Sequence, residues 1–325
     1  MQRHTWLAIL ALAAGASGTP AQMVGEGFGS QCGTAGTLVG EYCYRVAEAI
    51  QVVQPRVGIA LSGGNPVMGT ASTLGMRLGA MPRISIGLRA SAAAVEVGGI
   101  ESLSDAEKMT FPVPAVSADV AIGLFSGVGL GPTVGGLGSI DLLGSVGTIP
   151  LPSGEGFDGS PFSWAAGARL GILRESFTAP GISVSGTYRK VGEIEYGDPE
   201  LASEDAYFLM DDLSAWSLRG TISKRLLALG LTAGAGYDRY DSAVLLRVDD
   251  PNPLNDDFEL SSDGLESSRT TFFGNVSLTM MILHLAGEFG WQSGGDPDFA
   301  EQPQAQREYL DRGGIYGSLA LRLTF

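Results

Sequence analysis

The residues that could carry chemistry are few, and their pattern argues against an active site. The chain has 2 histidines, and only His284 lies beyond the amino-terminal segment, so serine–histidine catalysis would depend on it, with Glu288 as a neighbour. The sequence contains no nucleophile elbow, Walker motif, Rossmann fingerprint, C-x-x-C or H-E-x-x-H. Two cysteines without a nearby histidine cannot complete a zinc site. We predict no enzymatic activity, no cofactor and no metal centre.

Charged side chains recur in segments where every second residue is polar. Placing the polar positions on one interior face gathers the following candidates: Arg83, Arg89, Asp119, Asp141, Arg169, Arg189, Arg219, Asp238, His284, Glu288 and Arg322. Charges in a narrow interior must be paired. Two interpretations remain open: a salt-bridged core that stiffens the wall, or a basic stripe that lines a pore and selects anionic or polar solutes.

The elements that must position these residues are alternating strands, and the clearest is Gly313–Phe325. Its apolar positions are Ile315, Leu319, Leu321, Leu323 and Phe325, and they alternate with Tyr316, Ser318, Ala320, Arg322 and Thr324. A period of two predicts a strand with one apolar face and one polar face. Arg322 would lie on the polar face.

The same pattern predicts twelve strands in all. In chain order they are Arg56–Ser62, Thr70–Leu78, Arg83–Val95, Ala115–Val128, Val134–Ile149, Phe162–Arg174, Gly181–Tyr196, Leu213–Leu226, Ala228–Val248, Ser267–Met280, Met281–Gln292 and Gly313–Phe325. Short connections (79–82, 129–133, 175–180, 226–227 and 280–281) then fall at one end. Long connections (98–114, 149–161, 197–212, 249–266 and 293–312) fall at the other.

Composition limits the class of protein. Charged residues make up only 17% of the 325 residues, and mean hydropathy is +0.17. No apolar run of the length needed for a membrane helix exists beyond the amino terminus. The net charge of −15 argues against nucleic acid as a partner. An apolar chain without long apolar runs suits alternating strands in lipid.

The amino-terminal part is organised differently. Residues 1–21 have the basic, apolar and small-residue regions of a secretory signal peptide. Residues 22–55 follow, with a helix predicted over 34–53 from its apolar spacing and ended by Pro55. This helix could be a plug inside a barrel or a cap at its periplasmic mouth. Cys32 and Cys43 bracket its start, and an oxidising compartment would favour a disulfide between them.

Signal peptide, alternating strands, acidic long loops and terminal Phe325 together resemble bacterial outer-membrane β-barrel proteins over about residues 56–325. The resemblance implies an all-β antiparallel barrel in the outer membrane, with membrane lipid as a partner and Phe325 as the signal to the barrel-assembly machinery. Asn65-Pro66 after an apolar helix is similar to the amino-terminal hatch of long-chain fatty-acid transporters. No binding residues are carried over from them.

Acidic residues gather in the loops 197–212, 249–266 and 293–312, which hold about half of the 35 acids. One interpretation is that these acids keep the outer loops solvated, since a charge at a loop tip stays in water and costs little free energy. The alternative is that they bind divalent cations, for example at Asp249, Asp250, Asp256 and Asp257. For the whole protein we expect a passive channel or transporter for small solutes. The alternative is a closed structural or adhesive barrel that acts through its acidic extracellular loops.

Overall fold

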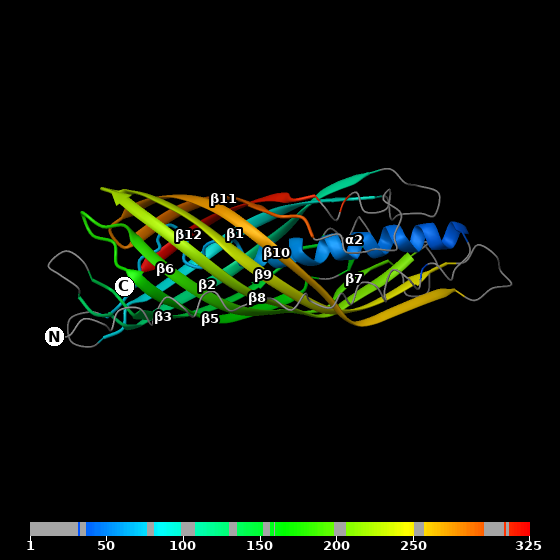
Figure 1. Ribbon diagram of the computed structural model, residues 1–325, viewed down its shortest axis with the longest axis horizontal. Coiled ribbons are helices and arrows are strands. Elements are labelled where there is room, and N and C mark those ends of the chain that lie inside the picture. Colours follow the sequence, from blue (N-terminus) through cyan, green and yellow to red (C-terminus); the bar gives the residue numbers. More distant parts are fainter. Residues whose placement is uncertain are drawn as a thin grey trace, which may run out of the picture.

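The computed structural model describes residues 32, 37–76, 81–98, 108–129, 135–151, 157–158, 160–197, 206–249, 257–295, 309 and 312–325. One antiparallel sheet dominates the fold (Figure 1). Its long strands are β1 (Ile84–Val97), β2 (Met109–Phe125), β3 (Ser139–Thr148), β5 (Phe162–Leu173), β6 (Gly181–Val191), β8 (Ala206–Leu226), β9 (Leu229–Val248), β10 (Phe258–Met280), β11 (Leu283–Gln292) and β12 (Gly314–Thr324). Two short strands, β4 (Phe157–Asp158) and β7 (Ile194–Tyr196), and one helix, α2 (Thr37–Ser62), complete the elements.

The long strands close on themselves. Neighbours in the chain pair around the ring, β12 pairs with β1, and β8 pairs with β9, which gives a closed barrel of 10 strands with β4 and β7 outside the ring. The all-β barrel and ten of the twelve predicted strands are confirmed. The closing strand β12 pairs with β1, with Leu321 opposite Leu88, so the first predicted strand, Arg56–Ser62, takes no part in closing the ring.

The first two predicted strands are wrong. Arg56–Ser62 continues the helix, and the part of Thr70–Leu78 that the structure describes, residues 70–76, is irregular chain. A short apolar run does not distinguish a strand from a buried helix by periodicity alone. Because both segments are lost, the strand number stays even, as is the rule for bacterial outer-membrane barrels.

The two ends of the barrel differ in their connections. β8 and β9 are joined at Leu227–Ala228, and β10 and β11 at Met281–Ile282, while the opposite end carries the long connections. In outer-membrane barrels the short turns face the periplasm. We therefore refer to the end with these turns as the periplasmic end and to the other as the extracellular end.

The outward side chains of the barrel form an apolar belt. Leu88 is 61% exposed, Trp216 63% and Leu319 66%, and their neighbours on the same parity are also apolar. Toward the extracellular end Trp164, Tyr188 and Trp216 pack against one another, with ring centroids 5.9 and 4.9 Å apart. An apolar belt edged by aromatic residues is the surface that a barrel presents to lipid.

No helix among the described residues is long and apolar enough to cross a membrane.

Beyond the aromatic edge the polarity of the strands inverts. On β9, the inward positions change from Asp238 to buried Val244 and Leu246, while the outward positions change from Leu231 to Arg239. The strands therefore continue past the belt with an apolar interior and a charged exterior. This inversion explains why β8 and β10 begin earlier than the predicted Leu213 and Ser267. The prediction followed segments whose apolar residues face outward, and that pattern stops at the edge of the lipid-facing belt.

Helix α2 occupies the interior of the barrel along its long axis (Figure 1). Every side chain from Val46 to Leu61 is buried. A helix that is buried on all sides has no polar face to reveal its period. The interior position excludes the periplasmic cap, and Pro55 lies inside the helix, so the predicted end at residue 53 is wrong. Burial of Val57, Ile59 and Leu61 after the proline offsets the hydrogen bond that proline cannot donate.

Helix α2 ends at Ser62, and the next residue turns the chain. Gly63 has a φ of 61° and donates from its backbone N–H to the carbonyl of Ile59 at 2.8 Å. This left-handed conformation after a helix is one that glycine adopts without steric cost. A disulfide joins Cys32 to Cys43 near the other end of the helix.

Candidate functional site

The candidate site is the filled lumen. We call residues 37–76, which comprise α2 and the irregular segment 63–76, the plug. Successive plug residues hydrogen-bond to wall residues that lie nearer and nearer the periplasmic turns: Gln54 to Ser242, Asn65 to Asn275, Ala71 to Ser223, and Met76 to Ser126. The plug therefore crosses the lumen once, and the amino-terminal end of α2 lies at the extracellular end.

Two arginines of the wall hold the carbonyls at the end of α2. Arg89 on β1 donates from Nη1 to the carbonyl of Ser62 at 2.6 Å and from Nη2 to the carbonyl of Pro66 at 3.2 Å. Arg219 on β8 donates from Nε to the carbonyl of Gly64 at 3.1 Å. Cations suit the end of a helix, where carbonyl groups lack partners and the helix dipole is negative.

Each of these arginines is anchored by an acid of the neighbouring strand. Arg89 lies 3.0 Å from the Oδ2 of Asp119, and Arg219 lies 2.8 Å from the Oδ1 of Asp238. The Arg219–Asp238 pair is buried in the wall, with 2% and 0% of the side chains exposed. A buried pair needs further hydrogen bonds to offset desolvation, and here the carbonyls of the plug supply them.

A wall carboxylate binds the amides of the same plug segment. Glu288 on β11 accepts the backbone N–H of Gly64 at 2.7 Å and that of Asn65 at 2.9 Å. Asn275 on β10 donates to Glu288 at 2.6 Å and accepts from the Asn65 side chain at 3.0 Å. The segment 62–66 is thus bound through its carbonyls by arginines and through its amides by a carboxylate. We call Arg89, Arg219, Glu288 and Asn275 the clamp.

Nearer the periplasm a second acid binds the plug. Asp141 on β3 accepts the backbone N–H of Leu74 at 3.1 and 3.0 Å and pairs with Arg169 on β5 at 2.7 Å. Neither charged side chain is more than 2% exposed. The hydroxyl oxygens of Thr73 and Ser139 are 2.5 Å apart. The irregular part of the plug is therefore fixed by side chains of the wall.

Toward the extracellular end the helix itself supplies the polar contacts. Gln54 donates to the carbonyl of Leu265 at 2.7 Å, and Arg56 donates to the Oε1 of Gln292 at 3.1 Å. Burial lowers the pKa of Arg56, which lies on α2 rather than in the wall, below its ordinary value. Around these contacts the packing is apolar, through residues such as Ile50 and Leu246.

Close approach between plug and wall depends on two glycines. A Cβ at Gly58 would lie 2.0 Å from the ring of Tyr240, and a Cβ at Gly64 would lie 2.3 Å from the ring of Phe273 and 2.5 Å from the hydroxyl of Tyr316. Real Cβ atoms do not approach so closely. These three inward aromatic rings therefore leave room only for backbone, and they narrow the lumen around the plug.

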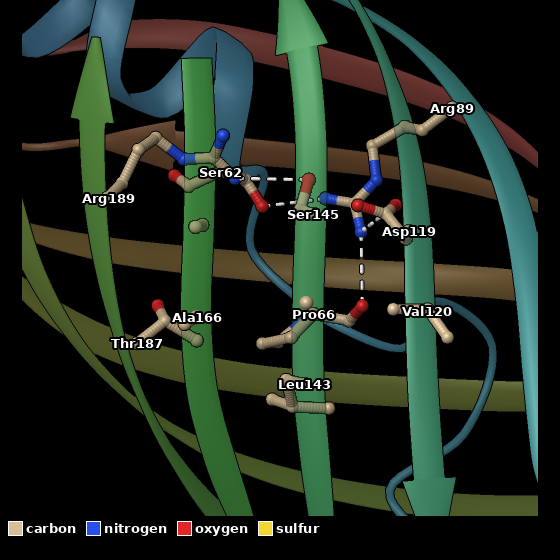
Figure 2. Close-up of a pocket in the computed structure, with 12 residues that line it drawn as sticks. Ser62, Pro66, Arg89, Asp119, Val120, Leu143, Ser145, Ala166, Thr187 and Arg189 are labelled. Atoms are coloured by element: carbon tan, nitrogen blue, oxygen red, sulfur yellow. Dashed lines mark hydrogen bonds and ion pairs between the residues drawn. The ribbon is translucent and has the colours of Figure 1, made fainter.

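Little space remains between plug and wall. The described residues enclose one cavity of about 30 Å³ beside Arg89 and Arg189 and another of about 20 Å³ beside Met68 and Arg322. Figure 2 shows the first, with Arg89 between Asp119 and Pro66 and with Arg189 directed toward Ser145. A cavity of this size accommodates about one water molecule. Neither of these two cavities has room for a solute much larger than water. A larger, open hollow of about 340 Å³ lies at Ser223, Thr232 and Asn275 and is lined by no plug residue.

The remaining predicted lumen residues take different places. Arg83 precedes β1 and is exposed. Arg189 is buried and donates to the Oγ of Ser163 at 2.8 Å. The Nδ1 of His284 lies 3.0 Å from the Oγ1 of Thr279.

Two further predicted residues lie on β12 and at its end. Arg322 is 8% exposed and lies between His284 and Gly87 of the neighbouring strands. Phe325 exchanges backbone hydrogen bonds with Ile84 and is exposed on the outer face. The carboxyl-terminal residue therefore takes part in closing the barrel beside β1.

Sequence reasoning missed the plug side of the site and part of the wall. Asn65 was noted only for its neighbour Pro66, and Asn275, Phe273 and Tyr240 were not singled out. Asn65 carries a local signal, because its Oδ1 accepts the N–H of Val67 at 3.1 Å in a turn that asparagine favours. The inward aromatic residues occupy the strand positions that otherwise carry polar side chains. Alternation shows that these positions face the lumen, but it does not show whether they bind a plug or line a pore.

Within the described ranges, no group of three or more His, Cys, Asp or Glu side chains is arranged to hold a metal ion. Of the four acids named for the divalent-cation alternative, Asp250 and Asp256 lie outside those ranges.

Comparison with known proteins gives relatives by fold only. No family model and no curated protein sequence matches the chain. Among solved structures, the translocator domain of the autotransporter NalP from Neisseria meningitidis is 10% identical, with 86% of this chain and 97% of that chain covered and a TM-score of 0.44. The outer membrane protease OmpT from Escherichia coli is 12% identical, with 75% and 96% covered and a TM-score of 0.36. A TodX monoaromatic hydrocarbon channel is 10% identical, with 75% and 89% covered and a TM-score of 0.30.

The closed barrel, its apolar belt and its short turns at one end satisfy the requirements of a bacterial outer-membrane protein. The protein is an outer-membrane β-barrel.

Proposed function

We propose that this outer-membrane barrel is closed and acts at the cell surface, through the part of the molecule that extends beyond the membrane. The observation that carries the proposal is the plug, which crosses the lumen from end to end and is bound on several sides. This differs from our first expectation of a passive channel and favours the alternative of a structural or adhesive barrel. The role needs no catalytic step.

The extracellular extension supports a surface role. Beyond the aromatic edge, β8, β9 and β10 keep their pairing over a further stretch, with Ala206 opposite Val248 and Phe258 also opposite Val248. Their inward side chains, such as Phe208 and Leu260, pack in one apolar core with α2. A barrel that only conducts solutes has no need of a second, apolar core outside the membrane.

The outer surface of this extension is charged. Arg239 pairs with Glu266 at 2.7 Å and Arg247 with Glu259 at 2.8 Å, all on outward positions of β9 and β10. Exposed pairs contribute little to stability because solvent screens them. We propose instead that this polar surface, together with the acidic loops, is the face that meets partners outside the cell.

A solute channel would require the irregular segment 63–76 to leave the lumen, and this gives a direct test. Thr73→Cys combined with Ser139→Cys places two thiols where the native hydroxyl oxygens are 2.5 Å apart, so a disulfide can lock the plug to β3. We expect planar lipid bilayers that contain the unmodified protein to show no steady conductance. The locked variant should be equally silent before and after reduction.

A channel gives the opposite pattern. Conductance in the unmodified protein that disappears on locking and returns with a reducing agent would overturn the closed-barrel proposal. The pair Thr279→Cys and Ser293→Cys lies at opposite ends of the β10–β11 hairpin, where the two thiols cannot join, and controls for the effect of introducing thiols.

A further inference from the structure

The periplasmic half of the lumen contains a charge that the plug and the wall leave without a partner. Arg322 on β12 is 8% exposed, and its Nε and Nη1 atoms are buried without a hydrogen-bond partner. Three other lumen arginines, Arg89, Arg169 and Arg219, each pair with an aspartate. A fourth, Arg189, donates to the Oγ of Ser163. An ionised group buried without a partner is strongly unfavourable.

The charges around Arg322 make its position less favourable still. Those that act on it most are Arg169 and Arg225, which repel it. Its neighbour on β11 is His284, which can only add positive charge. The nearest acid that lines the same space is Asp119, and that carboxylate is already paired with Arg89 at 3.0 Å.

No acidic side chain at this end, within the part of the chain that the structure describes, is free to compensate this charge. Among the described residues, Glu175 is engaged near this end with Ser223, whose Oγ donates to it at 3.2 Å. An anion from solution would supply the counter-charge that the described side chains do not.

The structure leaves space for one small ion. The cavity of about 20 Å³ is lined by Arg322, by Ser85 and Gly87 of the wall, and by Pro66, Val67 and Met68 of the plug. Roughly 10–15 Å³ holds one water-sized particle. A water molecule fits but leaves the charge uncompensated, whereas a halide of similar size also neutralises it.

We propose that Arg322 binds a small monovalent anion, with chloride as the physiological ion, in the cavity between β12, β1 and the plug. Because residues of both plug and wall line the cavity, the bound anion stabilises the plugged state. The site is independent of the surface role proposed above.

The test measures thermal unfolding of the detergent-solubilised barrel in sodium chloride and in sodium gluconate at equal ionic strength. Gluconate is too large for the cavity. We expect the midpoint of the unmodified protein to rise by a few degrees in chloride and to saturate, as for a ligand that binds only the folded state. Arg322→Gln should lose this dependence and be more stable than the unmodified protein in gluconate, because it removes an uncompensated charge.

Arg83→Gln is the matched control, because Arg83 is an exposed arginine at the same end of the barrel and should leave the chloride effect intact. Crystals of the unmodified protein grown in bromide provide a second measurement that does not depend on a variant. We expect an anomalous peak beside the Arg322 guanidinium. Equal midpoints in chloride and gluconate, a chloride effect that persists in Arg322→Gln, or no bromide peak at this place would overturn the proposal.

Discussion

The charged members of the clamp bind the backbone of five plug residues, 62–66, and only Asn275 binds a plug side chain, that of Asn65. Arg89 and Arg219 bind carbonyls, and Glu288 binds the amides of Gly64 and Asn65. Hydrogen bonds to charged groups contribute more than those between neutral groups, and they are costly to leave unmade when buried. These contacts therefore depend on the charge of the wall residues, to which the plug presents backbone groups.

At the residue scale we predict that Glu288→Gln destabilises the barrel. Glutamine keeps one acceptor but places an amino group where a plug N–H now donates, so one buried donor loses its partner. The expected cost is about 1–3 kcal/mol, measured from urea unfolding in detergent.

Glu259→Gln is the control, because its carboxylate is exposed and pairs only with Arg247 at the surface. We expect a change of less than about 1 kcal/mol there. An equal effect of the two substitutions would show that Glu288 does not hold the plug.

At the scale of elements, α2 is shaped to a lumen that leaves no room for a side chain at Gly58. Its backbone approaches the ring of Tyr240, which is 1% exposed and hydrogen-bonded through its hydroxyl to Gln292 at 3.0 Å. The ring is therefore held in place and cannot move aside freely. Packing, rather than helix propensity, decides which residue occupies this position.

We predict that Gly58→Ala destabilises the barrel, although alanine is the better helix former. The added methyl would meet the Tyr240 ring at 2.0 Å, and overpacking of this kind costs typically about 1–3 kcal/mol. Unfolding in denaturant measures the change.

Gly274→Ala on β10 provides the comparison, because a Cβ there has only one neighbour, at 3.8 Å. The double variant Gly58→Ala with Tyr240→Leu should recover part of the loss. If Gly58→Ala is more stable than the unmodified protein, then the helix does not sit against Tyr240 as described.

The strands also show why membrane boundaries are hard to read from polarity alone. On β1, Ser85 and Arg89 are inward in the belt, but Ala93, Val95 and Val97 occupy the same parity above it and are buried against α2. The period is two along the whole strand, but the apolar residues face lipid in the belt and face the interior above it. Only the position of α2 distinguishes the two regions.

At the scale of the whole molecule, the direction of the plug fixes the topology. The plug runs from the extracellular end to the periplasmic end before β1 begins, so the start of α2 is outside the cell. We predict that a cysteine at Glu41, an exposed position of α2, reacts with a large maleimide reagent in intact cells. Gel mobility of the labelled protein gives the measurement.

Phe177→Cys is the counterpart at the periplasmic end, where Phe177 is 99% exposed in the turn between β5 and β6. It should react only after the outer membrane is permeabilised. The background is low because the described residues contain no free cysteine. Labelling of Glu41→Cys only in permeabilised cells would contradict the topology.

The sequence by itself determined the barrel. Alternation predicted twelve strands, of which ten form the ring, and it predicted the lipid-facing sides of those ten, such as Ile86, Leu88 and Leu321. Contact with lipid acts on each strand separately and leaves a local pattern. It also placed Arg89, Arg219 and Glu288 on the inner face. The sequence also assigned the short and the long connections to opposite ends of the barrel. The length of a connection is a local property of the two strands that it joins.

The tertiary structure alone decided what fills the lumen. The segment from Arg56 to Ser62 is helical because the closed wall buries it on every side, and a uniformly buried segment has no periodicity to read. Whether inward arginines line a pore or bind a plug depends on backbone carbonyls that come from residues far away in the chain. Such contacts exist only once the ring of strands has closed around the plug, and local sequence pattern carries no record of them.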